Sequence, residues 1–311
     1  MLGMMRLVTP RQGGNRSLER REALYGFLFI APALLGMLIF NLGPIIAALF
    51  ISFTRYSILT TPKWTGVANY QKAFSESLVS LSFANTAYYT VISVPLGIGL
   101  AFAVALLLNR IKGAYIYRTA FYVPAVVPSV ASAVIWLVML NPNVGLVNYF
   151  ISLFGIKGPG WLISPDWATP GLILMSLWGI GTGMVLYLAG LQGVPEHLYE
   201  AAEIDGASPL RRFWAITVPM MTPTLFFHLI LGLIASFQVF NAPFIMTKGG
   251  PVKSTYFVSL LIYDNAFRYF KMGYASAIAW ILFVLVLVLT IIVLKTSSSW
   301  VYYESGTRGR F

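Results

Sequence analysis

The densest group of side chains that could do chemistry lies in residues 196–205, where four of the chain's ten acidic residues fall within ten positions. Glu200, Glu203 and Asp205 offer negative charge to a basic partner. The Ala201–Ala202 pair keeps one face of the segment flat, so that another protein's surface can approach the backbone closely. The pattern therefore predicts either a docking site for a soluble protein or an exposed amphipathic helix without a partner.

Covalent catalysis and metal binding find little support in the composition. The chain has no cysteine and only two histidines, His197 and His228, so that neither a disulfide framework nor a structural zinc site is expected. Residues 250–255 resemble a phosphate-binding loop, but the glycine that should precede Lys253 is missing. We therefore expect no catalytic residue, no metal ligand and no cofactor in this chain.

His228 stands in an apolar stretch of the sequence. A proton relay would need a carboxylate partner inside the membrane, but all ten acidic residues lie in loops or tails. We therefore expect His228 to be a hydrogen-bonded core residue. The lack of Asp, Glu, Lys and Arg in the apolar stretches also argues against transport coupled to an ion.

Helix start and stop signals surround the acidic group. Pro195 suits the first position of a helix, and Gly206 suits the left-handed residue that ends one. Ser208 and Pro209 then suit the cap and the first residue of a second helix. Residues 194–219 are thus predicted to form a short surface helix, a glycine corner and a second short helix.

The distribution of charge predicts the elements that position this segment. Charged residues make up 10% of the 311-residue chain, against about 25% of a soluble domain. Six windows contain no Asp, Glu, Lys or Arg, and each exceeds the roughly 20 residues that a spanning helix needs. These windows are 23–54, 77–109, 119–156, 167–195, 213–247 and 272–294.

The sequence thus predicts an all-α polytopic membrane protein with six transmembrane helices. We place them at about 23–53, 84–109, 119–140, 169–193, 220–246 and 274–294. Pro124 and Pro128 predict a distorted first turn in the third helix. One membrane domain, residues 23–295, would then lie between an N-terminal tail (1–22) and a C-terminal tail (296–311).

Basic residues orient the helices. Thirteen Lys and Arg fall on the side that carries both tails, and eight fall on the other side. Because Lys and Arg favour the cytoplasmic side, we expect both termini in the cytoplasm. Topology then accounts for the net charge of +11, and we expect membrane lipid rather than nucleic acid around the chain.

The segment after the fourth helix resembles the signature of ABC-importer permeases. That signature is Glu-Ala-Ala, three residues, Gly, nine residues, Ile, any residue and Leu-Pro. Here it is matched by Glu200, Ala201, Ala202, Gly206, Ile216 and Pro219, with Val218 in place of Leu. The resemblance implies a type I importer permease fold in a bacterial or archaeal plasma (inner) membrane. It also implies that 194–219 is a coupling segment seated in a cleft of an ATP-hydrolysing subunit.

Further motifs resemble the carbohydrate-uptake branch, the maltose-permease and glycerol-phosphate-permease types. They are Ala31–Ala33, Pro44, Ser52–Thr54, Gly66–Tyr70, Asn85–Thr86, Leu188–Gln192 and Thr247–Pro251. The resemblance implies a sugar or sugar-like solute and a plain six-helix member of the branch. It implies three kinds of partner as well: a second homologous permease, an ABC ATPase dimer that uses ATP and Mg, and an extracytoplasmic solute-binding protein.

Polar and small residues in the fourth and fifth helices are candidates for the solute pathway, because polar groups facing lipid are costly. They are Trp178, Gly179, Thr182, Gly232, Ser236, Gln238, Val239 and Asn241. The resemblance places the family's solute contacts near 175–182 and 232–239. Helix packing is the alternative at each position, since Gly179 and Gly183 also form a small-residue packing motif.

Three other functions remain open on the sequence. An ABC importer for a non-sugar solute would keep the Glu200 signature. A stand-alone secondary carrier or channel would leave that segment without a partner. A membrane enzyme would need clustered acid, histidine or serine side chains at the membrane face, which the sequence lacks.

Overall fold

The computed structural model describes residues 16–111 and 113–302. Its helices are α1 (Arg16–Met37), α2 (Gly43–Ser52), α3 (Ala68–Ser75), α4 (Ser77–Asn109), α5 (Tyr115–Val126), α6 (Ser129–Met139), α7 (Leu146–Ser152), α8 (Pro165–Leu177), α9 (Gly181–Gln192), α10 (Glu196–Ile204), α11 (Pro209–Arg212), α12 (Val218–Phe237), α13 (Val258–Tyr263) and α14 (Met272–Trp300). Four π-helical turns interrupt or extend them: η1 (Leu38–Leu42), η2 (Phe213–Thr217), η3 (Pro243–Thr247) and η4 (Asp264–Arg268). Strands β1 (Thr54–Arg55) and β2 (Lys63–Trp64) form one antiparallel hairpin.

The fold confirms the predicted all-α membrane class. Four continuous helical stretches are long and apolar enough to span a membrane: Arg20–Ser52, Ser77–Asn109, Pro209–Phe237 and Met272–Trp300. The bent pairs α5–α6 and α8–α9 bring the number of spans to six if each pair is one span.

The third predicted helix is more distorted than the sequence suggested. It begins at Tyr115 rather than 119, and it bends by 100° between Val126 and Ser129 instead of in its first turn. Val127 is extended, with φ −67° and ψ 128°, as expected for a residue that precedes a proline. Pro128 also has no N–H to continue the helical hydrogen bonds.

Other helix bounds also differ from the prediction. α1 begins at Arg16 and α14 continues to Trp300, so both helices run into segments expected to be tails, while α4 begins at Ser77 rather than 84. Polar residues can extend a spanning helix beyond the apolar layer, where hydropathy no longer marks it. The fifth predicted helix, by contrast, ends early at Phe237, because Gln238 leaves the helical region at φ −104° and ψ 9°.

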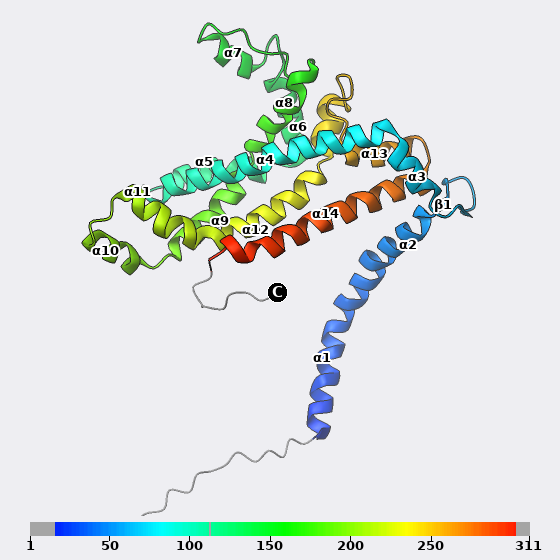
Figure 1. Ribbon diagram of the computed structural model, residues 1–311, viewed down its shortest axis with the longest axis horizontal. Helices are drawn as coiled ribbons and strands as arrows, with labels where there is room; N and C mark the ends of the chain where they lie inside the picture. Colours follow the sequence, from blue (N-terminus) through cyan, green and yellow to red (C-terminus); the bar gives the residue numbers. More distant parts are fainter. Residues whose placement is uncertain (1–15, 112, 303–311) are drawn as a thin grey trace, which may run out of the picture.

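The long helices α4, α12 and α14 run side by side, α9 packs beside α4, and α5 packs on α9 (Figure 1). α10 and α11 lie at one end of this bundle, which we call the α10 end. The hairpin, α3 and α13 lie on the opposite side, which we call the hairpin side. α6, α7 and the start of α8 form an arm that projects from the bundle.

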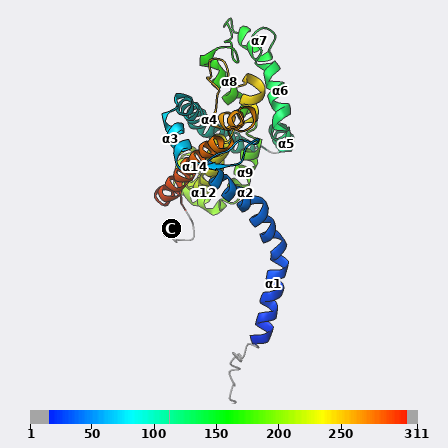
Figure 2. The same cartoon turned by 90° about the vertical axis from the view of Figure 1, so that its right-hand side faces the viewer.

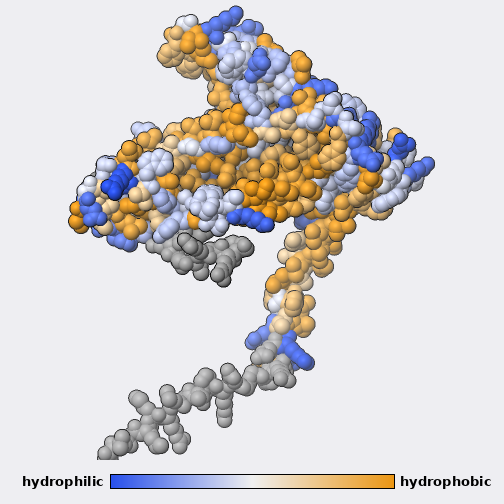
Figure 3. All heavy atoms as spheres, in the orientation of Figure 1, coloured by the Kyte–Doolittle hydropathy of each residue, from blue (hydrophilic) through white to orange (hydrophobic). Residues whose placement is uncertain are grey.

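α1 stands apart from the bundle in both views (Figures 1 and 2). Ser52 is the only buried residue of α2, and none of the described side chains of α1 or η1 is buried. The surface of this helix and of the bundle's middle is apolar, while hydrophilic residues gather at the α10 end and along the hairpin side (Figure 3). An apolar belt between two polar regions is the surface of a protein that crosses a bilayer.

Candidate functional site

The acidic segment forms the predicted helix, corner and helix. α10 begins after Pro195. Gly206 forms the corner that follows α10, and its φ of 72° is a left-handed conformation that favours glycine. Ser208 caps α11, because its hydroxyl accepts a hydrogen bond from the backbone N–H of Arg211 at 3.3 Å. The local signals in the sequence therefore determine this part of the structure.

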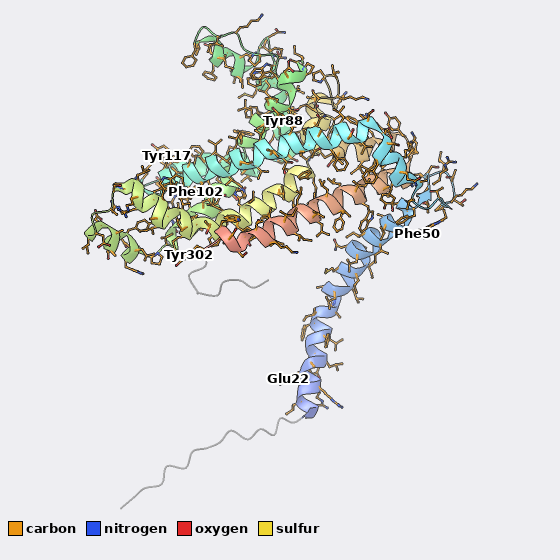
Figure 4. The ribbon with its side chains drawn as sticks, viewed as in Figure 1. Glu22, Phe50, Tyr88, Phe102, Tyr117 and Tyr302 are labelled. Carbon is orange, nitrogen blue, oxygen red and sulfur yellow. The ribbon has the colours of Figure 1, made fainter. Side chains whose placement is uncertain are left out.

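Two contacts hold α10 against the start of the following helix, and a third packs that start on α4. The hydroxyl of Tyr199 in α10 lies 2.9 Å from the hydroxyl of Thr217 in η2. Arg212 donates to Glu203 at 3.1 Å. Phe213 stacks on Phe102 of α4 with ring centroids 6.3 Å apart, and Figure 4 shows Phe102 near the α10 end. Of these residues the sequence pointed only to Glu203, as a charge for a partner protein, because the partners of the others lie up to 18 positions away or on another helix.

The predicted coupling residues divide between the exposed side and the bundle side of this segment. Glu200, Ala201, Asp205 and Gly206 are exposed, and Ala202 is half-buried. Ile216 and Pro219 are also half-buried, at the junction with α12. Three large apolar side chains of the same segment are exposed: Ile204 (88%), Leu210 (68%) and Trp214 (64%). Exposed apolar groups mixed with carboxylates are typical of a protein-docking surface.

A pocket of about 320 Å³ opens between α4, α8 and the break at the end of α12. Its lining residues are Tyr89, Ser129, Leu172, Met175, Ser176, Gln238, Val239, Phe240, Asn241 and Ala242. None of these carries a charge. The pocket thus combines two aromatic rings with hydroxyl and amide groups.

The break in the fifth helix builds one wall of this pocket. Residues 238–240 are not helical, and the chain resumes a helical path at Asn241 before η3. Asn241 donates to the hydroxyl of Ser129 in α6 at 2.7 Å. Irregular backbone inside a membrane protein is tolerated where it lines a cavity or is covered by protein, and this break does line the cavity.

Three of the eight predicted pathway residues, Gln238, Val239 and Asn241, line the pocket. Trp178 instead packs edge-to-face on Trp136 at 6.1 Å. Ser236 is buried and donates to the carbonyl of Leu233 at 2.9 Å.

The small residues of the predicted pathway lie elsewhere. A Cβ at Gly232 would lie 3.3 Å from Val94, so this glycine serves the packing of α12 on α4. Gly179 and Thr182 are exposed at the α8–α9 bend. Tyr89, Ser129 and Ser176 were missed, because tyrosine and serine in apolar helices are common and carry no distinctive spacing.

His228 is hydrogen-bonded, as predicted, but it is half-buried rather than part of the buried core. Its Nδ1 lies 2.7 Å from the hydroxyl of Tyr187, which is fully buried in α9. A side chain at Gly183 would run into the His228 ring, so this glycine allows α9 and α12 to approach each other. Gly183 thus serves helix packing, which was the alternative for the predicted Gly179–Gly183 motif. A Cβ at Gly179 would contact no neighbouring helix.

Spanning helices, a surface element at one end and a polar pocket within the bundle define a membrane transport protein. The family described as the binding-protein-dependent transport system inner membrane component matches residues 93–302, more than half of the chain. The chain belongs to this family.

Relatives extend the likeness over almost the whole chain. The probable ABC transporter permease protein YesP of Bacillus subtilis (strain 168) is 41% identical over 92% of this chain and 94% of its own length. The trehalose/maltose transport system permease protein MalF of Thermococcus litoralis is 37% identical over 89% and 95%. The fold is shared with a chain of a bacterial alginate ABC transporter, solved with an alginate pentasaccharide-bound periplasmic protein, at a TM-score of 0.78 and 24% identity over 91% and 96%.

Proposed function

We propose that this chain is the transmembrane subunit of an ATP-driven importer that translocates a sugar or sugar-like solute delivered by a solute-binding protein. The observation that carries the proposal is the exposed α10 segment with the complete Glu200–Pro219 spacing, held to the start of α12 in a chain of this family. Relatives named for trehalose/maltose and for sn-glycerol-3-phosphate support the solute class.

The chemistry of the pocket suits a saccharide. A sugar has apolar ring faces and hydroxyl edges, and the pocket offers the rings of Tyr89 and Phe240 beside the amides of Gln238 and Asn241. This half-open pocket is one wall of the pathway, and a second, homologous permease supplies the facing wall. Gln238, Val239 and Asn241 are the contacts that we assign to the solute.

Energy reaches this chain from a separate ATPase dimer, which binds ATP and Mg and docks on α10. Closure of the ATPases pushes α10, and the Tyr199–Thr217 and Glu203–Arg212 contacts pass the displacement to the start of α12. α12 is a 20-residue helix whose far end is followed directly by the pocket residues 238–242. A push at the α10 end thus reaches the pocket through one continuous helix.

The last described residues attach a second long helix, α14, to the start of α12. The backbone N–H of Tyr302 donates to the hydroxyl of Thr222 at 2.8 Å, and Trp300 packs edge-to-face on Phe226 at 5.7 Å. Figure 4 shows Tyr302 where α14 reaches the α10 end. The end of α14 therefore moves with the first turns of α12. In this arrangement the α10 end and both termini lie on the cytoplasmic side of the plasma membrane.

Reconstitution tests the proposal. The complex recovered with this chain in mild detergent is placed in vesicles with ATP inside, and uptake of maltose, trehalose, glycerol 3-phosphate and amino acids is measured. We expect uptake of one sugar-like solute only when ATP and the solute-binding protein are both present. Uptake by the purified chain alone would contradict the proposal in favour of a secondary carrier, and ATP-driven uptake of an amino acid would overturn the solute class.

A further inference from the structure

Seven basic side chains are exposed on the hairpin side, and we call them together the basic face. They are Arg55, Lys63, Lys72, Lys248, Lys253, Arg268 and Lys271. Hydrophilic residues gather along this side in Figure 3. The face includes the hairpin, the start of α14 and the loop that follows η3, so it covers the ends of several helices rather than a single loop.

The acidic residues within this face are already engaged. The carboxylate of Glu76 accepts a hydrogen bond from the Tyr274 hydroxyl. Asp264 is 4% exposed, accepts from the Tyr256 hydroxyl at 2.8 Å and lies 3.2 Å from Arg268. Arg268 is the only member of the basic face with a carboxylate within 4.0 Å in the described part of the chain. The face therefore presents cations to its surroundings with little internal neutralisation.

The hairpin places two of these cations directly opposite each other. Arg55 on β1 pairs in register with Lys63 on β2, and both side chains are exposed. Like charges in directly opposed cross-strand positions destabilise a hairpin. An anionic partner seated over the pair would remove this repulsion.

The backbone beneath the face is held in place. The amide of Asn69 donates to the carbonyls of Ser52 and Thr54 at 2.8 and 2.9 Å, which fixes the base of the hairpin. In the loop after η3, the carbonyl of Lys253 accepts from Asn85 at 2.8 Å, and that of Ser254 accepts from Thr169 at 3.0 Å. Asn85 lies one turn from the pocket residue Tyr89 on α4. The cations are thus displayed on a preformed support, part of it close to the pocket.

We propose that the basic face is the docking surface for an acidic patch on the solute-binding protein. This inference rests on the proposed function and names the surface and its charge. Basic residues on the side of the membrane away from the cytoplasm work against the preferred topology, so their presence calls for a compensating contact. Complementary charge raises the rate at which a soluble partner finds its site. Lipid headgroups would neutralise cations at the ends of the spans, such as Arg55 and Lys271, whereas Lys63, Lys72, Lys248 and Lys253 lie on the hairpin, on α3 and in the loop after η3.

The test uses the assembled complex in nanodiscs and, as probe, the solute-binding protein recovered with it and then produced separately. ATP hydrolysis is measured as this protein is titrated, at low and high salt. Lys63→Glu is the informative variant, because it places a carboxylate opposite Arg55 and so should strengthen the hairpin while it weakens docking. Lys295→Glu is the matched control, since Lys295 is exposed at the α10 end and the net charge changes equally.

At low salt, the half-saturating concentration of the binding protein should rise about 3- to 10-fold for Lys63→Glu and stay unchanged for Lys295→Glu. The difference should shrink at high salt. Equal values for the two variants would overturn this inference but leave the proposed function intact. A defect seen only in nanodiscs that contain phosphatidylglycerol would assign the face to anionic lipid and would also overturn it. If the binding protein does not stimulate the unaltered complex, the proposed function itself fails.

Discussion

The hydroxyl groups of Tyr199 and Thr217 lie 2.9 Å apart and join the exposed helix α10 to the turn that begins the long helix α12. Thr217 is buried, and it closes a π-helical turn that runs from Phe213. π-helical turns often mark functional sites. α12 begins directly after Thr217, with Pro219 in its first turn, and leads toward the pocket. Together with the Arg212–Glu203 contact, this hydrogen bond connects α10 to the helical stretch that leads into the membrane.

Tyr199→Phe removes the hydrogen bond and keeps the ring. We expect ATP hydrolysis by the assembled complex to be retained, while the solute transported per ATP falls about 3-fold, because displacement of α10 is passed on less completely. The measurement is uptake and hydrolysis in the same vesicles. Thr217→Val should give the same ratio, and the double variant should be no worse than either single variant. Additive losses would mean that the two hydroxyls act separately.

Gly206 sets the corner between α10 and α11, and its φ of 72° is unfavourable for a side chain. Gly206→Val should cost about 1–2 kcal/mol locally and misplace α10, so that ATPase subunits dissociate during purification. Glu200→Lys should also weaken ATPase binding, but without loss of thermal stability, because Glu200 is exposed. The amount of ATPase retained on the purified chain measures both effects. Full retention and full uptake in both variants would refute the coupling role.

Gln238 and Ser236 provide a matched pair near the pocket. Gln238 is exposed and lines the pocket. Ser236 is buried, and its hydroxyl donates to the Leu233 carbonyl of the same helix. Gln238→Ala should raise the KM of solute uptake several-fold and leave the Tm unchanged, because only a solute contact is lost. Ser236→Ala should leave the KM unchanged. A higher KM in the serine variant alone would move the solute contacts from the helix break to the helix itself.

Tyr256 stabilises the loop side of the basic face through Asp264. Tyr256→Phe leaves the buried Oδ2 of Asp264 without its donor, which should cost about 1–3 kcal/mol of unfolding free energy. Thermal unfolding of the purified complex checks this, and Tyr269→Phe, on an exposed side chain, serves as control. An unchanged Tm for Tyr256→Phe would show that solvent replaces the phenol.

The same pair predicts a pH dependence. Burial raises the pKa of Tyr256 above its ordinary value, and the neighbouring Asp264 raises it further. The folded state therefore favours the neutral phenol. Its contribution is complete at neutral pH and declines once the pH exceeds about 10, the pKa of an unfolded tyrosine. The stability difference between the unaltered protein and Tyr256→Phe should consequently shrink above that pH, and a difference that grew there would contradict this account.

The sequence predicted the membrane class and the α10 segment because both depend on local signals. Charge-free windows mark spanning helices directly, and Pro195, Gly206 and Ser208 act on their own neighbours. The pocket depends on where distant helices meet, and for this reason Gln238 could be proposed from its polarity, while Tyr89 and Ser129 could not. Ser236 is also polar, but its hydroxyl donates to the carbonyl of Leu233 in the same helix and does not line the pocket.

The bends show the same limit. Pro128 predicted a distortion of the third helix. The 100° angle between α5 and α6 depends on the packing of α5 on α9 and of α6 on η3, which the local sequence does not encode. The break at Gln238 has no proline or glycine beside it, so nothing in the local sequence marked the end of α12. The opposed Arg55 and Lys63 could be recognised only once the register of the hairpin was known.

The most direct test of the central claim is a cross-link between α10 and the ATPase. The chain has no cysteine, so Glu200→Cys gives a single reactive site, and Lys63→Cys on the hairpin side gives a matched control. Each variant is treated with a short bifunctional thiol–amine reagent in native membranes, and the products are identified by mass spectrometry. The account predicts an ATPase cross-linked to Glu200→Cys and none to Lys63→Cys. Failure of Glu200→Cys to capture an ATPase, or equal capture by both variants, would contradict it.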